Sequence, residues 1–119
     1  MAVEPSDLAR ELVRRHKGEL DAAHRRAKEV RGLIDVEAAA LIAEGVAARA
    51  WLIGSLAWGN FGVRSDVDLV FQGLRVDQLG AIAARVASRV NAPVDVLRIE
   101  EIPEAFRRRI LAEGVELGA

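Results

Sequence analysis

The central stretch of this 119-residue chain constrains the fold more than any other part of the sequence. A short apolar run at residues 51–53 ends abruptly at the Gly54-Ser55 pair, which predicts a buried strand followed by a tight turn. A second apolar run at residues 67–71 predicts another strand, with Asp68 inside it and Asp66 just before it. Because successive strand side chains point to opposite faces, we expect both carboxylates on one face and their apolar neighbours in the core.

The acidic pair and the glycine turn offer two complementary kinds of binding group. Two carboxylates a few ångströms apart repel each other, so such pairs usually shift their pKa values or bind a cation. All-oxygen ligands suit Mg²⁺, which proteins hold through one or two carboxylates together with substrate phosphates. At Gly54 the backbone N–H groups can approach a phosphate closely, and a helix N-terminus behind the turn favours anions. The stretch therefore predicts phosphoryl-type transfer, whose catalysis depends mainly on positioning and charge stabilisation.

The rest of the chain predicts a small domain of mixed class. Strand signals occur at residues 49–53, 67–72 and 94–98. A helix with Asp77 as its cap is expected at residues 78–90, and a last helix is expected to begin near Pro103. In that last helix Phe106 and Ile110 should pack one turn apart. This order of elements predicts an α/β (α+β) domain with a small mixed sheet flanked by helices.

The first third of the chain predicts helix. Apolar residues repeat every seven positions along residues 7–44, as in seams that pack helix on helix: Val13, Leu20, Ala27, Ile34 and Leu41. Gly18 and Gly32 weaken a helix, so two helices with a break near Gly32 are expected, and one long bent helix is the alternative. Residues 1–32 would then be an N-terminal helical extension and residues 33–119 the main domain. The extension either lies solvated against the domain or contacts a partner, including a second copy in a homo-oligomer.

Composition narrows the classes of partner and location. The chain has 17 Lys and Arg residues against 18 Asp and Glu residues, so it lacks the basic surplus of a dedicated nucleic-acid binder. It has no cysteine, which excludes disulfides and thiolate metal sites. No apolar run approaches the length of a membrane span, and the first residues lack the apolar core of a signal peptide. We therefore expect a cytoplasmic protein that does not enter a membrane.

The motifs resemble the signature of the DNA polymerase beta-like nucleotidyltransferases, in particular their small minimal branch. The matching parts are the Gly54-Ser55 pair, Gly59, the sequence SDVDL at residues 65–69, and a third acidic residue, Asp95, on a later strand. The resemblance covers residues 38–117 and implies the polymerase beta-like fold for the region from residue 33 onward. Residues 33–119 are therefore expected to form the nucleotidyltransferase domain.

The resemblance implies a two-metal site built from three carboxylates. Asp66 and Asp68 would bind both Mg²⁺ ions, and Asp95 would bind the catalytic ion and help to deprotonate the attacking hydroxyl group. In such sites one ion activates the nucleophile and the other stabilises the leaving oxygen. Without the resemblance, the same three residues could be a turn residue, a strand-edge residue and a cap, all solvated.

The resemblance also implies a set of phosphate-binding residues. Ser55 would donate a hydrogen bond to a phosphate oxygen of ATP, and Gly54 would allow the close approach. Arg64 could neutralise phosphate charge or balance the acidic pair, and Ser65 could bind phosphate or only orient the loop. Family members often carry an arginine after the Gly-Ser pair, whereas this chain has Leu, Ala and Trp at residues 56–58, which removes one triphosphate contact.

Together these features predict a minimal nucleotidyltransferase that uses Mg²⁺ to move AMP from ATP to an acceptor hydroxyl group. Small members of this family are commonly MntA-like antitoxins paired with a helical HEPN-type toxin, and some silence the toxin by adenylylating a tyrosine. The resemblance therefore implies such a toxin as the partner. Two alternatives stand: an antitoxin-like module that neutralises its partner by binding alone, and a small-molecule enzyme of the aminoglycoside nucleotidyltransferase type. A polymerase is disfavoured, since the chain has no evident template-binding domain.

Overall fold

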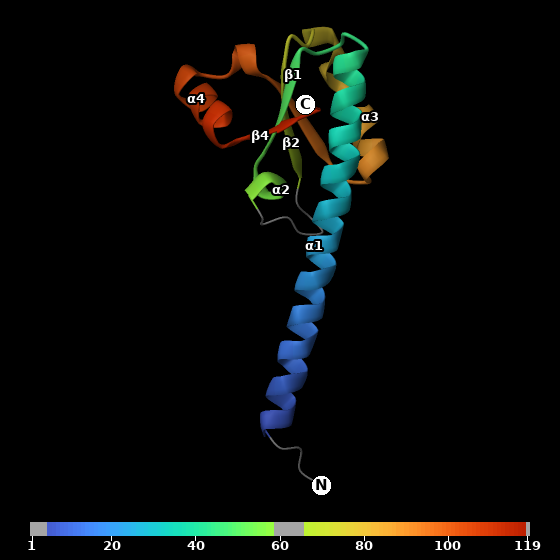
Figure 1. The fold of residues 1–119 in the computed structure, drawn as a ribbon, viewed down its shortest axis with the longest axis vertical. Helices are drawn as coiled ribbons and strands as arrows, with labels where there is room; N and C mark the ends of the chain where they lie inside the picture. Colours follow the sequence, from blue (N-terminus) through green and yellow to red (C-terminus); the bar gives the residue numbers. More distant parts are fainter. Residues whose placement is uncertain (1–4, 59–65, 119) are drawn as a thin grey trace.

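The computed structural model describes residues 5–58 and 66–118. In chain order its helices and strands are α1 (Pro5–Ala43), β1 (Arg49–Ile53), α2 (Ser55–Trp58), β2 (Val67–Gln72), α3 (Leu79–Val90), β3 (Val94–Arg98), α4 (Glu104–Glu113) and β4 (Val115–Leu117). Two short 3₁₀ turns, η1 (Val76–Gln78) and η2 (Ile99–Glu101), precede α3 and follow β3. Figure 1 shows an α/β body from which the N-terminal half of α1 projects.

The four described strands form one mixed sheet in the order β3-β2-β1-β4. β1 pairs antiparallel with both β2 and β4, and β2 pairs in parallel with β3. The mixed α/β class is confirmed, and so are the three predicted strands with their predicted bounds. β4 was not expected, because a strand of three residues is too short to show the alternation that identifies longer strands.

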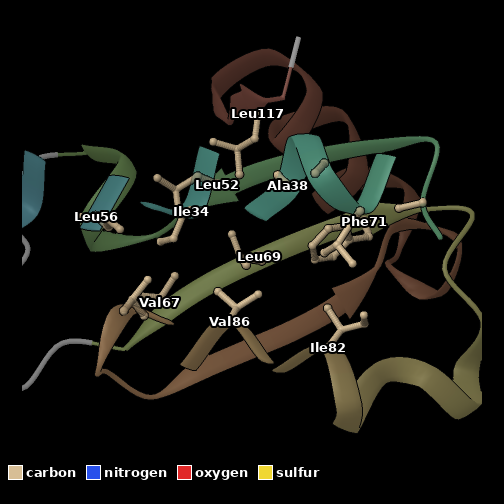
Figure 2. Packing of buried hydrophobic residues seen from close by; sticks show 14 of the residues in the cluster. Ile34, Ala38, Leu52, Leu56, Val67, Leu69, Phe71, Ile82, Val86 and Leu117 are labelled. Atoms are coloured by element: carbon tan, nitrogen blue, oxygen red, sulfur yellow. The ribbon is translucent and has the colours of Figure 1, made fainter. Parts of the chain in front are cut away.

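One face of the sheet is covered by α1 and α3 and carries the main hydrophobic core. Val67, Leu69 and Phe71 alternate along β2, and all three are buried in one cluster with Ile34 of α1 and Val86 of α3 (Figure 2). Burying a side chain of this size contributes about 1.5–3 kcal/mol relative to leaving it exposed. The alternation also fixes the direction of the residues between them, so Asp68 faces the opposite side of the sheet.

The opposite face carries a smaller cluster formed by Trp51, Val70, Ile99 and Ile110. Figure 1 shows α4 on the side of the strands opposite α1 and α3, and of the described side chains in this helix only that of Ile110 is buried. Phe106 is 61% exposed, so it does not join the core with Ile110, although both residues line the same small pocket. This face is therefore covered less completely than the α1 face, and Asp68 lies on it.

α1 is one helix of 39 residues, so the predicted break near Gly32 is wrong and the alternative of one long helix is confirmed. A helical glycine costs about 1 kcal/mol relative to alanine. Val30 and Ile34, on either side of Gly32, are both fully buried, and their burial outweighs that cost. After the helix ends at Ala43, Gly45 has a φ of +76°, and the N–H groups of Gly45 and Val46 donate hydrogen bonds back to the last turn.

The N-terminal half of α1 projects beyond the body of the domain (Figure 1). Its large apolar side chains are 46–68% exposed: Leu8, Leu12, Val13 and Leu20. Packing against the core begins near Ala27. The boundary predicted at residue 32 lies inside this helix, and the predicted contact with a partner or a second copy stays a prediction. None of the described helices combines the length and apolar character needed to cross a bilayer.

The start of α3 also differs from the sequence-based expectation. Asp77 lies in η1, where it accepts a 2.6 Å hydrogen bond from Arg75, and Gln78 occupies the N-cap position of α3. The predicted capping of α3 by Asp77 is therefore wrong. The 3₁₀ turn places Asp77 two residues before the helix and directs its carboxylate to a local arginine instead.

Candidate functional site

The register between β2 and β3 brings two of the predicted carboxylates side by side. Asp68 lies opposite Asp95 in this parallel pair, so both side chains share one face of the sheet. The N–H group of Val67 donates a 2.9 Å hydrogen bond to the carbonyl group of Pro93, which aligns the starts of the two strands. Asp66 immediately precedes β2 and is exposed. The three carboxylates therefore lie at the same end of two neighbouring strands.

This arrangement changes the pKa of the Asp68 carboxyl group. Partial burial raises the pKa of Asp68 above its ordinary value, and repulsion from Asp95 and then from Asp66 raises the pKa further. Burial and like charge both disfavour the ionised form, and a cation nearby would offset both effects. The position is therefore one at which a bound cation would be favourable.

Gly54 connects the glycine turn to this carboxylate. Its φ is +78°, a conformation that glycine adopts at little cost. A Cβ atom built at this position would lie 2.6 Å from Oδ2 of Asp68, closer than real side chains tolerate. Antiparallel pairing of Ile53 with Asp68 produces this approach. A larger residue at this position would therefore adopt a strained φ and displace the Asp68 carboxylate.

The segment after Gly54 forms the short helix α2, which begins at Ser55. Leu56 is buried in the main core and Ala57 packs against it. Leu56 and Ala57, which follow the Gly-Ser pair where family members often carry an arginine, therefore pack in the core. Gly59, Arg64 and Ser65, which the sequence analysis singled out, lie outside the described residues.

The described carboxylates fit Mg²⁺ only in combination with other ligands. Within residues 5–58 and 66–118, no group of three or more His, Asp and Glu side chains is close enough to hold a metal ion alone. Mg²⁺ demands octahedral oxygen coordination, and it is usually bound by one or two carboxylates, substrate phosphates and water. The Asp68 and Asp95 pair fits this second mode.

A small pocket of about 170 Å³ lies beside the glycine turn, with Ile53 and Gly54 on one side and Phe106, Arg109 and Ile110 of α4 on the other. The guanidinium group of Arg109 pairs with Glu113 at 2.8 Å. The sequence shows this arginine only as one of three consecutive arginines on the last helix. Its place near Gly54 could not be predicted without the position of α4 relative to β1.

A second charged cluster, which the sequence analysis did not identify, joins α1 to α3. The carboxylate of Glu37 is buried and accepts hydrogen bonds from Arg85 and Arg89, each at 3.0 Å. Arg85 also donates hydrogen bonds to Glu44. A signal was present in the sequence, because two arginines four residues apart on one helix can share a carboxylate on another. The cluster lies on the α1 side of the sheet and is structural.

Three solved structures share the fold of this chain. A toxin-antitoxin crystallised with AMP-PNP superposes with a TM-score of 0.60 and 17% identity, over 69% of this chain and 70% of that chain. A mutant of the toxin-antitoxin MntA-HpeT gives a TM-score of 0.53 and 20% identity, over 65% of each chain. A proposed minimal nucleotidyltransferase gives a TM-score of 0.58 and 21% identity, over 82% of this chain and 94% of that chain. At these identities the likeness shows a shared fold.

The sequence itself matches a family model. No curated protein matches this chain. The family described as "Polymerase beta, Nucleotidyltransferase" matches residues 40–118, a range that contains all four described strands, the glycine turn and the three aspartates. The match covers well over half of the sequence and agrees with the resemblance inferred from the motifs. The chain therefore belongs to the polymerase beta nucleotidyltransferase family.

Proposed function

We propose that this chain is an Mg²⁺-dependent nucleotidyltransferase that transfers AMP from ATP to a hydroxyl group on a partner protein. The observation that best supports this function is the pairing of Asp68 with Asp95 across β2 and β3, with Gly54 closed over the Asp68 carboxylate. Family membership makes nucleotidyl transfer the expected class of reaction. The base, the metal and the acceptor are the parts of the proposal that go beyond the family.

The carboxylates of Asp66, Asp68 and Asp95 would hold the metal. Bound Mg²⁺ supplies charge that stabilises the phosphates and lowers the pKa of the attacking hydroxyl group. Asp95 is more exposed than Asp68, so it is the better placed of the two to accept a proton from an incoming acceptor. As that proton leaves, the acceptor oxygen forms a bond to the α-phosphorus, and the bond between that phosphorus and the pyrophosphate oxygen breaks.

The glycine turn would hold the phosphates. At Gly54 the absence of a side chain lets backbone N–H groups approach phosphate oxygens, and the Ser55 hydroxyl group would donate a further hydrogen bond. Arg64 and Ser65 are proposed as additional phosphate contacts. These residues position the triphosphate so that its α-phosphorus lies near the carboxylates.

The proposed partner is a helical HEPN-type toxin, with this chain as its antitoxin. The support is the fold shared with two toxin-antitoxin structures, one of which contains AMP-PNP. A second candidate function, neutralisation of the partner by binding alone, is favoured by the use of Leu56 and Ala57 for packing where the family often has an arginine.

The first test is calorimetric titration of ATP, with Mg²⁺ present, into the purified chain and the Asp68→Asn variant. Asp77→Asn is the matched control, because it removes an exposed carboxylate outside the site. We expect the parent and the control to bind ATP, and Asp68→Asn to bind at least about tenfold more weakly, which corresponds to about 1.4 kcal/mol. Equal ATP binding by the Asp68→Asn variant and the parent would contradict the proposed site.

The second test measures transfer. The chain, ATP and Mg²⁺ are incubated with a helical toxin, and intact mass spectrometry measures the addition of one AMP to the toxin. We expect the parent to modify the toxin and the Asp68→Asn variant to leave it unmodified. If both proteins neutralise the toxin without modifying it, the binding-only alternative is the correct one.

A further inference from the structure

A groove of about 630 Å³ runs between α1 and β4, separate from the face that carries Asp68. Among the described residues, its α1 wall extends from His24 to Asp35, and the other wall contains Leu56 and all three residues of β4. We call it the α1–β4 groove. Its volume lies within the range of about 300–1,000 Å³ that is typical of ligand sites.

The shape of the groove indicates an extended occupant. Val115, Glu116 and Leu117 all line it, although successive side chains of a strand point to opposite faces of a sheet. A groove that touches all three must run along the edge of β4 rather than over one face. β4 is the last strand of the sheet, and within the described part of the chain no strand pairs with its other side. An unpaired edge of this kind binds peptides by adding them as a further strand.

The charges of the groove are unbalanced. Glu116 is neutralised by Arg49, with which it pairs at 2.6 Å. Asp35 accepts a 2.8 Å hydrogen bond from the neutral N–H group of Gly118 and keeps its charge, so it offsets only one of the two cations in the lining. Lys28 and Arg31, by contrast, make no hydrogen bond or ion pair with any residue in the described ranges. These cations lie on the α1 wall, opposite the strand edge. An occupant with carboxylate groups would complement them.

Apart from His24, the remaining described lining is apolar. Leu56 and Leu117 are both buried members of the main core and form part of the groove surface. Gly32 leaves open space on the α1 wall, because a Cβ atom there would meet nothing within 4 Å. A strand in this groove would therefore have room for alternate side chains, some against the apolar surface and some toward the cations.

We propose that the α1–β4 groove binds an extended acidic segment of a partner protein, in which apolar and acidic residues alternate, as an added strand beside β4. This interaction does not require nucleotide chemistry. It gives the partner a docking surface on the α1 side of the domain.

The test uses a fluorescent peptide of eight residues in which Val and Glu alternate, with anisotropy as the measurement. A peptide with Lys in place of Glu is the charge control. We expect the acidic peptide to bind at least about tenfold more tightly than the basic one at low salt, and to lose affinity as salt increases. On binding, amide exchange should slow at Glu116 on the edge of β4.

Matched variants of α1 test the location. Gly32→Leu fills the groove, and Gly18→Leu makes the same change on the projecting half of the same helix, where a Cβ atom also meets nothing within 4 Å. Both replace a helical glycine with a better helix former, so both should fold.

Lys28→Glu with Arg31→Glu reverses the charge of the groove, and Arg10→Glu with Lys17→Glu reverses the same charge outside it. We expect only the two groove variants to weaken peptide binding, by about tenfold or more.

The outcomes separate this proposal from the nucleotide site. Equal binding of the acidic and basic peptides, or full binding by Gly32→Leu, would overturn it. Displacement of the peptide by inorganic phosphate at similar concentration would also overturn it, because the groove would then be a site for small anions only. Asp68→Asn should bind the peptide normally, so failure of the nucleotide proposal would leave this result unchanged.

Discussion

The buried carboxylate of Glu37 gives the sharpest test of how α1 is held to α3. Its side chain is 6% exposed, whereas those of its partners Arg85 and Arg89 are 39% and 66% exposed. The cost of breaking the cluster therefore depends on which charged group is removed. Removal of both arginine charges leaves a buried carboxylate without a partner, whereas removal of the carboxylate leaves two guanidinium groups that water can reach.

The expected magnitudes follow from this asymmetry. Arg85→Met with Arg89→Met keeps the apolar stems but strands the Glu37 charge, and breaking a buried pair in this way costs about 3–5 kcal/mol. Glu37→Leu replaces the charge with an apolar group and should cost no more than about 1 kcal/mol. Adding Glu37→Leu to the double arginine variant removes the stranded charge. The triple variant should therefore recover most of the stability that the double variant loses.

Urea unfolding followed by circular dichroism measures these differences. With slopes of about 1–3 kcal/mol per molar urea, a loss of 3 kcal/mol lowers the midpoint by roughly 1–3 M. Glu44→Gln is the control, because it removes an exposed partner of Arg85 and leaves Glu37 paired. A triple variant no more stable than the double arginine variant would refute the reasoning, since the loss would then come from packing of the arginine stems.

Three further predictions use the same unfolding assay. Gly54→Ala should lower the free energy of unfolding by about 1–2 kcal/mol, because Gly54 has a positive φ. The same change should also weaken ATP binding, because the new Cβ atom would displace the Asp68 carboxylate. Gly80→Ala is the control and should not destabilise the protein, since a Cβ atom there meets nothing within 4 Å. Asp68→Asn should be more stable than the parent at pH 7, because the raised pKa of Asp68 means that its ionised form destabilises the folded state. The difference in stability between the variant and the parent should shrink as pH falls through the raised pKa toward the ordinary value of 3.8, where the parent carboxyl group becomes protonated. Deletion of residues 1–22 should change the free energy of unfolding by less than about 0.5 kcal/mol, whereas deletion of residues 1–32 removes the buried Val30 and should cost at least about 1.5–3 kcal/mol.

The strands of the sheet could be predicted because their signals are local. Residues 49–53, 67–72 and 94–98 each combine β-branched or aromatic residues with flanking turn residues, and the observed bounds agree. β4 could not be predicted from its three residues, because its strand conformation depends on pairing with β1. The same reason explains Phe106, whose exposure depends on where α4 lies relative to the sheet.

The aspartates could be singled out from the sequence, but their arrangement could not. Alternation places Asp68 on one face of β2, yet its neighbour depends on whether β3 runs parallel and in which register. The approach of Gly54 to Asp68 likewise depends on the register between β1 and β2. These are pairings between residues about 14 to 27 positions apart, and local periodicity carries no information about them.

The limits of the domain along α1 are set by the sheet and not by the helix. The seven-residue apolar repeat runs through both halves of α1, from Val13 to Leu41, and neither glycine interrupts it. The same repeat is exposed at Val13 and buried at Ile34 because the sheet and α3 cover only the C-terminal half. Arg26 marks the change, since it donates a 2.8 Å hydrogen bond to the carbonyl group of Val90 at the end of α3. The folded unit should therefore include α1 from about this residue onward, and the apolar side chains before it are available for contacts outside the domain.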